Sequence, residues 1–477
     1  MFGRLVKNHH LCTNKMLMSM KKMYFFLRVS LCLCSLGTAS VWAETGVSDL
    51  ADQDLNEPFG WVTCSSLTGG TYAATGGNAV SSPKTVTLTS NGAGVDMRSV
   101  LTTAIKNNQI IILDGSNGDF EISKKIELSN LSNKTIVGIN GARICTQFYI
   151  TDEIKAVLNS KGVLSASTSS GTGGTLTNGN SVSEAREYLT RQALIDYTGD
   201  SNESYRHAGI FYLNKCTNFI IRNLQLVGPG PVDVGGYDCL TCIDCKHLWV
   251  DHCDFTDGMD GNFDITNSAD FVTCSWCTFS YTERAYDHKN TNLVGSSDSE
   301  SSGLDVTYAF CEWGTGCNAR MPMARFGVIH LLNNYYNCAG NGSPAVNPRK
   351  NSKFLIEGNY FESGVTKIFS QSGAQRWTWT STNYTVESFS PTSSGTTVTV
   401  PYAYDEMAVA DVPSVVGTYA GATLSDPLTL GRESDLPVIE NWEDDNSPVY
   451  NLSGQRVNGQ DANTFQIRNG KIRIIVK

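Results

Sequence analysis

The feature that most constrains this chain is a short phrase that occurs five times between residues 253 and 361. Each copy has Cys or Asn, then a variable residue, then an aromatic residue, and it follows a short apolar run. The copies are Cys253-Asp254-Phe255, Cys277-Thr278-Phe279, Cys311-Glu312-Trp313, Asn334-Tyr335-Tyr336 and Asn359-Tyr360-Phe361, at intervals of 24, 34, 23 and 25 residues. A period near two dozen residues indicates one coil of a solenoid, because a single coil cannot bury its own inner face. We therefore predict an all-β fold, a right-handed single-stranded parallel β-helix with stacked side chains, and a loop inserted where the interval is longest.

A solenoid can take up most of a 477-residue chain as one domain, and we assign it residues 58–430. Its open end needs a cover, for which we predict a helix over residues 95–105 with an apolar face formed by Val100, Leu101, Ala104 and Ile105. Strands are predicted at 110–113 and 135–139.

Residues 150–205 break the repeat and predict an insertion on the flank of the β-helix. We expect a helix near Ser181–Tyr197, because Ser181 and Glu184 have the spacing of a capping box. Residues 431–477 predict a linker and a small β-hairpin tail. This tail resembles the sorting tails of secreted cargo proteins, and a plain structural appendage is the alternative.

The N-terminal segment has the pattern of a signal peptide. Lys21 and Lys22 precede an apolar run that ends in Val41-Trp42-Ala43, so we predict a signal peptide over 1–43, with Met20 as an alternative start, and a polar leader over 44–57. The protein is therefore expected to be secreted, without membrane insertion. Export permits disulfides whose pairing the sequence leaves open, although inward-facing positions in the coils explain cysteines such as Cys239, Cys242 and Cys245 better than a metal site does.

Charged residues that a solenoid does not need gather in the same region as the repeat. Asp260 and Asp264 lie four residues apart, Asp238 lies about one coil earlier, and Arg320 and Arg325 follow about one coil or more later. The net charge of −10 would repel a polyanion, so an anionic substrate would need local cations or a bridging metal.

Several phrases in this region resemble the pectate lyases of polysaccharide lyase family 1. They include WVDHCDF, DGNFD, VTCSWCTF, LVGSSD and RMPMARFG, and the resemblance covers roughly residues 58–425. It implies a calcium-dependent pectate lyase that cleaves (1→4)-α-D-galacturonan by β-elimination and releases 4,5-unsaturated oligogalacturonates. The implied partner is polygalacturonate or pectin, with no nucleic acid, and the protein is expected to be a monomer.

The resemblance also implies roles for six residues. Asp238, Asp260 and Asp264 match the calcium-binding carboxylates, with Asp260 where the family often has Glu. Arg320 matches the catalytic arginine, taken as the base at C5 of the uronate. An arginine is almost always protonated, so this role needs a strongly cationic setting. Arg325 and Lys289 match substrate-binding residues, although Lys289 stands six residues before Gly295 where the family has five, and Asn290 occupies the usual place.

Three alternatives stay open at this point. A pectin lyase would act on methylated polymer without metal, and it would be expected to lose the three aspartates. A non-catalytic β-helical pectin-binding protein would keep the repeat without the aspartate and arginine set. A polygalacturonase usually carries a Gly-His-Gly motif, which this sequence lacks. Within the motif WVDHCDF, His252 is expected to be structural.

Overall fold

The structure is a computed structural model that describes residues 57–300, 302–370, 376–386, 389 and 391–428, together with four short strands between 449 and 474. The predicted signal peptide and nearly all of the polar leader lie outside the described residues. No helix in the described part of the chain combines the length and apolar character needed to cross a membrane.

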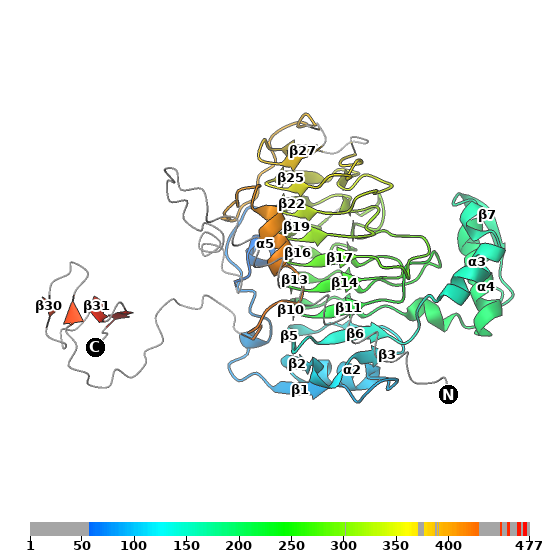
Figure 1. The fold of residues 1–477 in the computed structure, drawn as a ribbon, viewed down its shortest axis with the longest axis horizontal. Coiled ribbons are helices and arrows are strands. Elements are labelled where there is room, and N and C mark those ends of the chain that lie inside the picture. Colours follow the sequence, from blue (N-terminus) through cyan, green and yellow to red (C-terminus); the bar gives the residue numbers. More distant parts are fainter. Residues whose placement is uncertain are drawn as a thin grey trace, which may run out of the picture. The chain divides into compact units, whose positions relative to one another are not determined.

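Three parallel sheets form the body of the protein, and successive coils visit them in turn (Figure 1). The ten-stranded sheet contains, in order, β1 (Thr85–Thr89), β2 (Ile110–Asp114), β5 (Ser132–Ile139), β10 (Thr217–Arg222), β13 (Lys246–Asp251), β16 (Asp270–Ser275), β19 (Val306–Ala309), β22 (Val328–Leu332), β25 (Lys353–Glu357) and β27 (Arg376–Trp379). The nine-stranded sheet contains β28 (Tyr384–Thr385), β26 (Tyr360–Phe361), β23 (Tyr335–Tyr336), β20 (Glu312–Trp313), β17 (Thr278–Ser280), β14 (Asp254–Thr256), β11 (Gln225–Val227), β6 (Arg143–Thr146) and β3 (Phe120–Ile122). The seven-stranded sheet contains β24 (Asn347–Pro348), β21 (Met323–Ala324), β18 (Leu293–Val294), β15 (Phe263–Thr266), β12 (Leu240–Ile243), β9 (Phe211–Asn214) and β4 (Ile126–Ser129). The predicted all-β parallel β-helix is confirmed.

The repeated phrase produces a continuous aromatic stack inside the coils. Ring centroids lie 5.2 Å apart between Phe255 and Phe279 and 5.6 Å apart between Phe279 and Trp313. The stack continues to Tyr336 at 4.7 Å and to Phe361 at 4.2 Å. Adjacent strands lie about 4.8 Å apart, so one aromatic per coil at the same register position produces this spacing.

The first residue of the phrase forms a second ladder. The side-chain amide of Asn334 donates to Asn359 Oδ1 at 2.9 Å, and Asn359 donates to Asn383 Oδ1 at 3.0 Å. All three copies that begin with Cys are buried in the same core. The twelve cysteines of the described chain are all free of disulfides, and eleven of them are buried, which agrees with their predicted inward-facing positions.

The cap helix α2 spans Arg98–Asn107, so it begins three residues later than predicted. Leu101, Ala104 and Ile105 are buried as expected, but Val100 is 40% exposed. The prediction for Val100 is wrong because, at about 100° per residue, it lies about a quarter-turn from the centre of the face formed by Leu101, Ala104 and Ile105.

The insertion contains more structure than the sequence predicted. Helix α3 (Asp152–Ser160) and helix α4 (Ala185–Thr198) flank an antiparallel hairpin, β7 (Ser170–Thr175) and β8 (Ser181–Glu184). The predicted capping box is wrong, because Ser181 and Glu184 pair with β7 in extended conformation and α4 begins only at Ala185, without a side-chain cap. Both helices bury apolar side chains against Val232, Val234 and Met259.

The C-terminal part of the described chain packs back onto the coils. Helix α5 (Val412–Tyr419) buries Val412, Val415 and Val416 in a cluster with Trp276 and Phe310. In the predicted tail, β29 (Val449–Tyr450), β30 (Arg456–Val457), β31 (Phe465–Arg468) and β32 (Lys471–Ile474) form an antiparallel sheet. The sorting role of this tail stays a prediction.

Candidate active site

The three aspartates predicted to bind calcium come from two neighbouring coils. Asp264 is the second residue of β15, and it pairs in register with Thr241 of the adjacent strand β12. Asp238 lies two residues before β12, and Asp260 lies in the turn before β15. Because the two strands are hydrogen-bonded neighbours, residues at their starts lie at the same edge of the seven-stranded sheet.

Two of these carboxylates converge on one glycine. A Cβ atom on Gly261 would lie 2.9 Å from Asp238 Oδ1 and 3.0 Å from Asp264 Oδ1, so a larger residue there would collide with both oxygens. Asp238 Oδ2 accepts a hydrogen bond from Thr241 Oγ1 at 2.6 Å, and Asp264 Oδ1 accepts one from the Leu293 backbone N–H at 3.0 Å. Asp238 Oδ1 is buried and has no hydrogen-bond partner among the described residues.

Crowding of the carboxylates changes how readily each one ionises. Burial, followed by the negative charges of Asp264 and Asp260, raises the pKa of Asp238 well above its usual range. Burial and the charge of Asp260 raise the pKa of Asp264 to about 7. Burial acts on Asp260 as well, but the hydrogen bond from His288 outweighs it and lowers the pKa of that carboxyl. The carboxyl groups of Asp238 and Asp264 are therefore stabilised by a bound proton or a nearby cation.

Arg320 is the cation that these three carboxylates share. Its positive charge acts on the pKa of Asp238, Asp260 and Asp264, lowering each one. The residue adopts a left-handed backbone conformation with φ of 60°, which is uncommon for a residue with a side chain and is often found at functional sites. Its carbonyl accepts a hydrogen bond from the Asn292 N–H at 2.7 Å, which links it to the coil that follows Asp264.

Known proteins share this sequence pattern over the same region. A pectate lyase family model matches residues 192–425. Pectate lyase A from Aspergillus niger is 33% identical over 237 residues, which are 47% of this chain and 68% of that protein. The chain belongs to the pectate lyase family.

The chain is also similar to two further proteins. A pectate trisaccharide-lyase from Bacillus licheniformis is 32% identical over 225 residues, so the match spans 45% of this chain and 62% of that protein. A solved pectate lyase from a Bacillus species, in complex with trigalacturonate, has 19% identity and a TM-score of 0.45 over 76% of this chain and 98% of that chain.

Arg325 and Lys289, the two residues predicted to bind substrate, have different surroundings. The side chain of Arg325, directly after β21, donates from Nε to Asp298 Oδ1 at 2.9 Å and from Nη1 to the Gly295 carbonyl at 2.9 Å. Lys289 lines a cavity of about 640 Å³ with Tyr281, Arg284 and Thr315. Among the described residues, Lys289 makes no ion pair with Asp238, Asp260 or Asp264, whereas His288 pairs with Asp260.

His288 was not among the site residues predicted from the sequence. Its Nε2 atom lies 2.8 Å from Asp260 Oδ1, and its Nδ1 atom lies 3.9 Å from Asp233. Burial favours neutral imidazole, but the hydrogen bond and charge of Asp260 outweigh burial and raise the pKa of His288. Asn290 Nδ2 lies 3.1 Å from His288 Nε2, the nitrogen that also faces Asp260. The only signal in the sequence was its position beside Lys289, which by itself indicates no contact with Asp260.

His252, by contrast, has the structural role predicted for it. It is fully buried, with Nδ1 at 2.8 Å from Asp251 Oδ2, and its ring stacks on Trp276 at 5.8 Å.

The aspartates meet the chemical requirements of a hard cation in part. Calcium prefers carboxylate and carbonyl oxygens, and the buried, unpartnered Asp238 Oδ1 together with Asp264 offers two of them. Among the described residues no three His, Cys, Asp or Glu side chains form a ready metal-binding group, in agreement with the pairing of Asp260 to His288. Asp238 and Asp264 thus supply two oxygens of the kind that calcium prefers, and Asp260 would supply a third only after leaving His288.

Proposed function

We propose that this protein is a calcium-dependent pectate lyase that cleaves (1→4)-α-D-galacturonan by β-elimination. The observation that carries the proposal is the cluster of Asp238, Asp260 and Asp264 with Arg320 at one edge of the β-helix. Two buried carboxyls whose pKa values are raised by burial and by the charges of neighbouring carboxylates have a clear chemical reason to bind a divalent cation.

The residues of the cluster would have two roles, metal binding by the aspartates and proton removal by Arg320. Asp238 and Asp264 would hold Ca²⁺, which neutralises the uronate carboxylate and makes the C5 proton more acidic. Arg320 would face C5 and take that proton as the C5–H bond breaks. The electron pair then forms the C4–C5 double bond and the C4–O bond breaks. The leaving oxygen takes a proton from solvent water, and Arg320 returns its proton to the solvent. An arginine acts as a base only in a strongly cationic setting, so this role of Arg320 requires the calcium ion to be bound.

Positions at the edge of the cluster would bind neighbouring uronates. Arg325 presents a planar guanidinium that suits a carboxylate, and exchange of its exposed partner Asp298 for substrate would free it. Lys289 or Asn290 would contact the chain further along, and the contact of Asn290 with His288 favours Asn290 for the position nearer to the cluster.

The test is ultraviolet absorbance of the 4,5-unsaturated product from polygalacturonate, with calcium and with EDTA. Growth of the absorbance with calcium and its loss with EDTA are expected. Turnover that survives EDTA and prefers methylated polymer would support the pectin lyase alternative. Binding of polymer without any absorbance change would support a non-catalytic pectin-binding protein.

Secretion and a monomeric state belong to the same proposal. A polymer too large to enter a cell has to be cleaved outside it, and the pattern of residues 1–43 supports export. N-terminal sequencing of protein from the culture medium should begin directly after Ala43, and light scattering should give the mass of one chain.

A further inference from the structure

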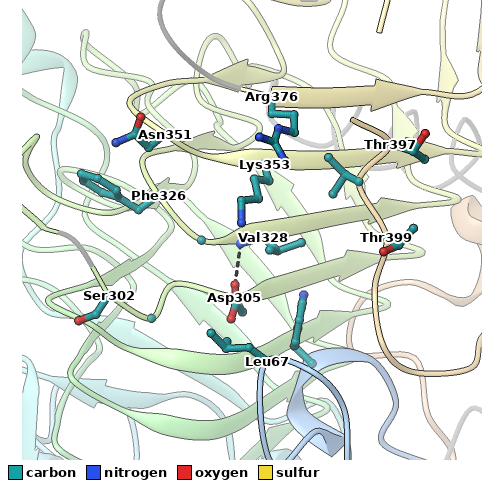
Figure 2. A pocket seen from close by; sticks show the side chains of 14 residues that line it. Leu67, Ser302, Asp305, Phe326, Val328, Asn351, Lys353, Arg376, Thr397 and Thr399 are labelled. Carbon is teal, nitrogen blue, oxygen red and sulfur yellow. Dashed lines mark hydrogen bonds between the residues drawn. The ribbon is translucent and has the colours of Figure 1, made fainter. Parts of the chain in front are cut away.

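A second cavity, of about 580 Å³, lies beside the ten-stranded sheet, whereas the aspartate cluster lies beside the seven-stranded sheet. It opens at the start of β19, β22, β25 and β27 in the ten-stranded sheet (Figure 2). Segments from both ends of the described chain help to line it, with Trp61 and Leu67 from the N-terminal side and residues 397–399 from the C-terminal side. Neither Arg320 nor any of the three aspartates lines this cavity.

Two buried polar atoms of the lining residues have no partner in the described part of the chain. They are Trp61 Nε1, a donor, and Asp305 Oδ2, an acceptor, and their residues are 1% and 2% exposed. The other oxygen of Asp305 is used, because Oδ1 accepts from the Val328 N–H at 2.6 Å. Unpaired buried donors and acceptors are rare and unfavourable. A hydroxyl group satisfies both kinds, since it accepts and donates.

Two cations stand beside these atoms. Val328, Lys353 and Arg376 are register partners on successive strands, so the two basic side chains lie one above the other, with Asp305 on the coil below (Figure 2). Both basic residues are exposed. Neither makes an ion pair with another residue of the described chain. In a protein with a net charge of −10, an adjacent unpaired Lys and Arg create a local site for an anion.

Together these groups select a ligand that carries both a carboxylate and hydroxyls. A simple inorganic anion would pair with Lys353 and Arg376 but would leave Trp61 Nε1 and Asp305 Oδ2 without partners. A neutral sugar would satisfy Trp61 and Asp305 but leave both cations unpaired. Phe326 and Val328 add apolar surface, as is typical of ligand pockets with few polar groups.

We propose that this cavity is a second carbohydrate-binding site that takes one hexuronate unit of an acidic polysaccharide. The sugar hydroxyls would pair with Trp61 Nε1 and Asp305 Oδ2, and the uronate carboxylate would pair with Lys353 and Arg376. This site would hold polymer on the enzyme without taking part in the chemistry. It stands independently of the proposed lyase activity, because none of its residues belongs to the aspartate cluster.

The test is calorimetric titration of trigalacturonate into the full chain in the presence of EDTA, which removes calcium. Wild-type protein and the control Lys161→Gln, which removes the positive charge of an exposed lysine of the insertion, should bind equally. The double variant Lys353→Gln/Arg376→Gln should bind at least tenfold more weakly. Asp305→Asn replaces the unpaired acceptor by a donor and should also weaken binding, while its Oδ1 still accepts from Val328.

The outcomes separate this site from the lyase activity. Equal binding by the double variant, equal binding of a neutral galactose trisaccharide, or no binding at millimolar trigalacturonate would each overturn the proposal, whatever the activity. If the protein is a lyase, the double variant should raise KM for polygalacturonate by about threefold or more and leave kcat unchanged. An unchanged KM would also count against the site. Because both substituted residues are exposed, the double variant should fold, which a circular dichroism spectrum checks.

Discussion

Replacing Asp305 by Asn should make the folded protein more stable at alkaline pH and remove a pH dependence that one buried carboxyl creates. Burial, followed by the negative charge of Asp270, raises the pKa of Asp305 to about 7. The Asp305 N–H donates to Asp270 Oδ1 at 3.0 Å, which places the two side chains close together. Lys353 offsets only part of this effect.

The magnitude follows from the difference between folded and unfolded chains. An unfolded aspartate titrates near about 3.9, so between about pH 4 and pH 7 the native state keeps a proton that the unfolded state has released. Stability therefore falls as the pH rises through this window. Between pH 5 and pH 8 the loss assigned to Asp305 is about 2.5 kcal/mol, at about 1.4 kcal/mol for each pKa unit.

The assay is urea unfolding of wild type and Asp305→Asn at pH 5 and pH 8, in EDTA and at one salt concentration. The stability difference between variant and wild type should shift in favour of the variant by about 2.5 kcal/mol at the higher pH. Asp196→Asn, at an exposed position on α4, is the control and should show no such shift. An identical pH dependence in wild type and Asp305→Asn would refute the reasoning.

Three further changes test the site and the core. Asp264→Ala should remove most turnover on polygalacturonate, and excess calcium should restore only part of it, as initial rates across calcium concentrations would show. Arg320→Lys should lower kcat by about 100-fold or more with little change in KM, and near-normal product absorbance would exclude Arg320 as the base. Phe279→Ala should lower the free energy of unfolding by about 3–5 kcal/mol, and a loss below about 1 kcal/mol in urea denaturation would contradict its place in the stack.

The repeated phrase was sufficient to predict the fold because two of its properties agree. Its period indicates one coil per repeat, and its Cys, Asn and aromatic residues indicate inward-facing positions that stack from coil to coil. Phe255, Phe279 and Trp313 recur once per coil, and the register of parallel strands stacks them at 5.2 Å and 5.6 Å. The 34-residue interval between Cys277 and Cys311 likewise predicted extra chain. A solenoid contacts only its neighbouring repeats, so local sequence determines most of its core.

Elements outside the repeat were harder to predict, because tertiary pairing overrides local signals there. Ser181 and Glu184 have the spacing of a capping box, yet the antiparallel pairing of β7 with β8 draws them into a strand. Val100 satisfies a helical apolar pattern, but it lies at the margin of the apolar face and is 40% exposed, and the width of the face that packs on the coils is not determined by the pattern alone.

In the site, residues placed by strand register could be predicted from the sequence, and residues in turns could not. Asp264 is fixed by its strand, opposite Thr241 on the neighbouring coil, so a sequence that predicts the coils also predicts that Asp238 and Asp264 lie close together. Asp260 and His288 lie in turns, whose conformations the repeat does not determine, and their contact at 2.8 Å could not be read from spacing. This contact has a chemical consequence. It lowers the pKa of Asp260 and occupies an oxygen that a cation would otherwise use, so a cation at Asp238 and Asp264 must either compete with His288 for the third carboxylate or take its next oxygen from the carboxylate of the substrate.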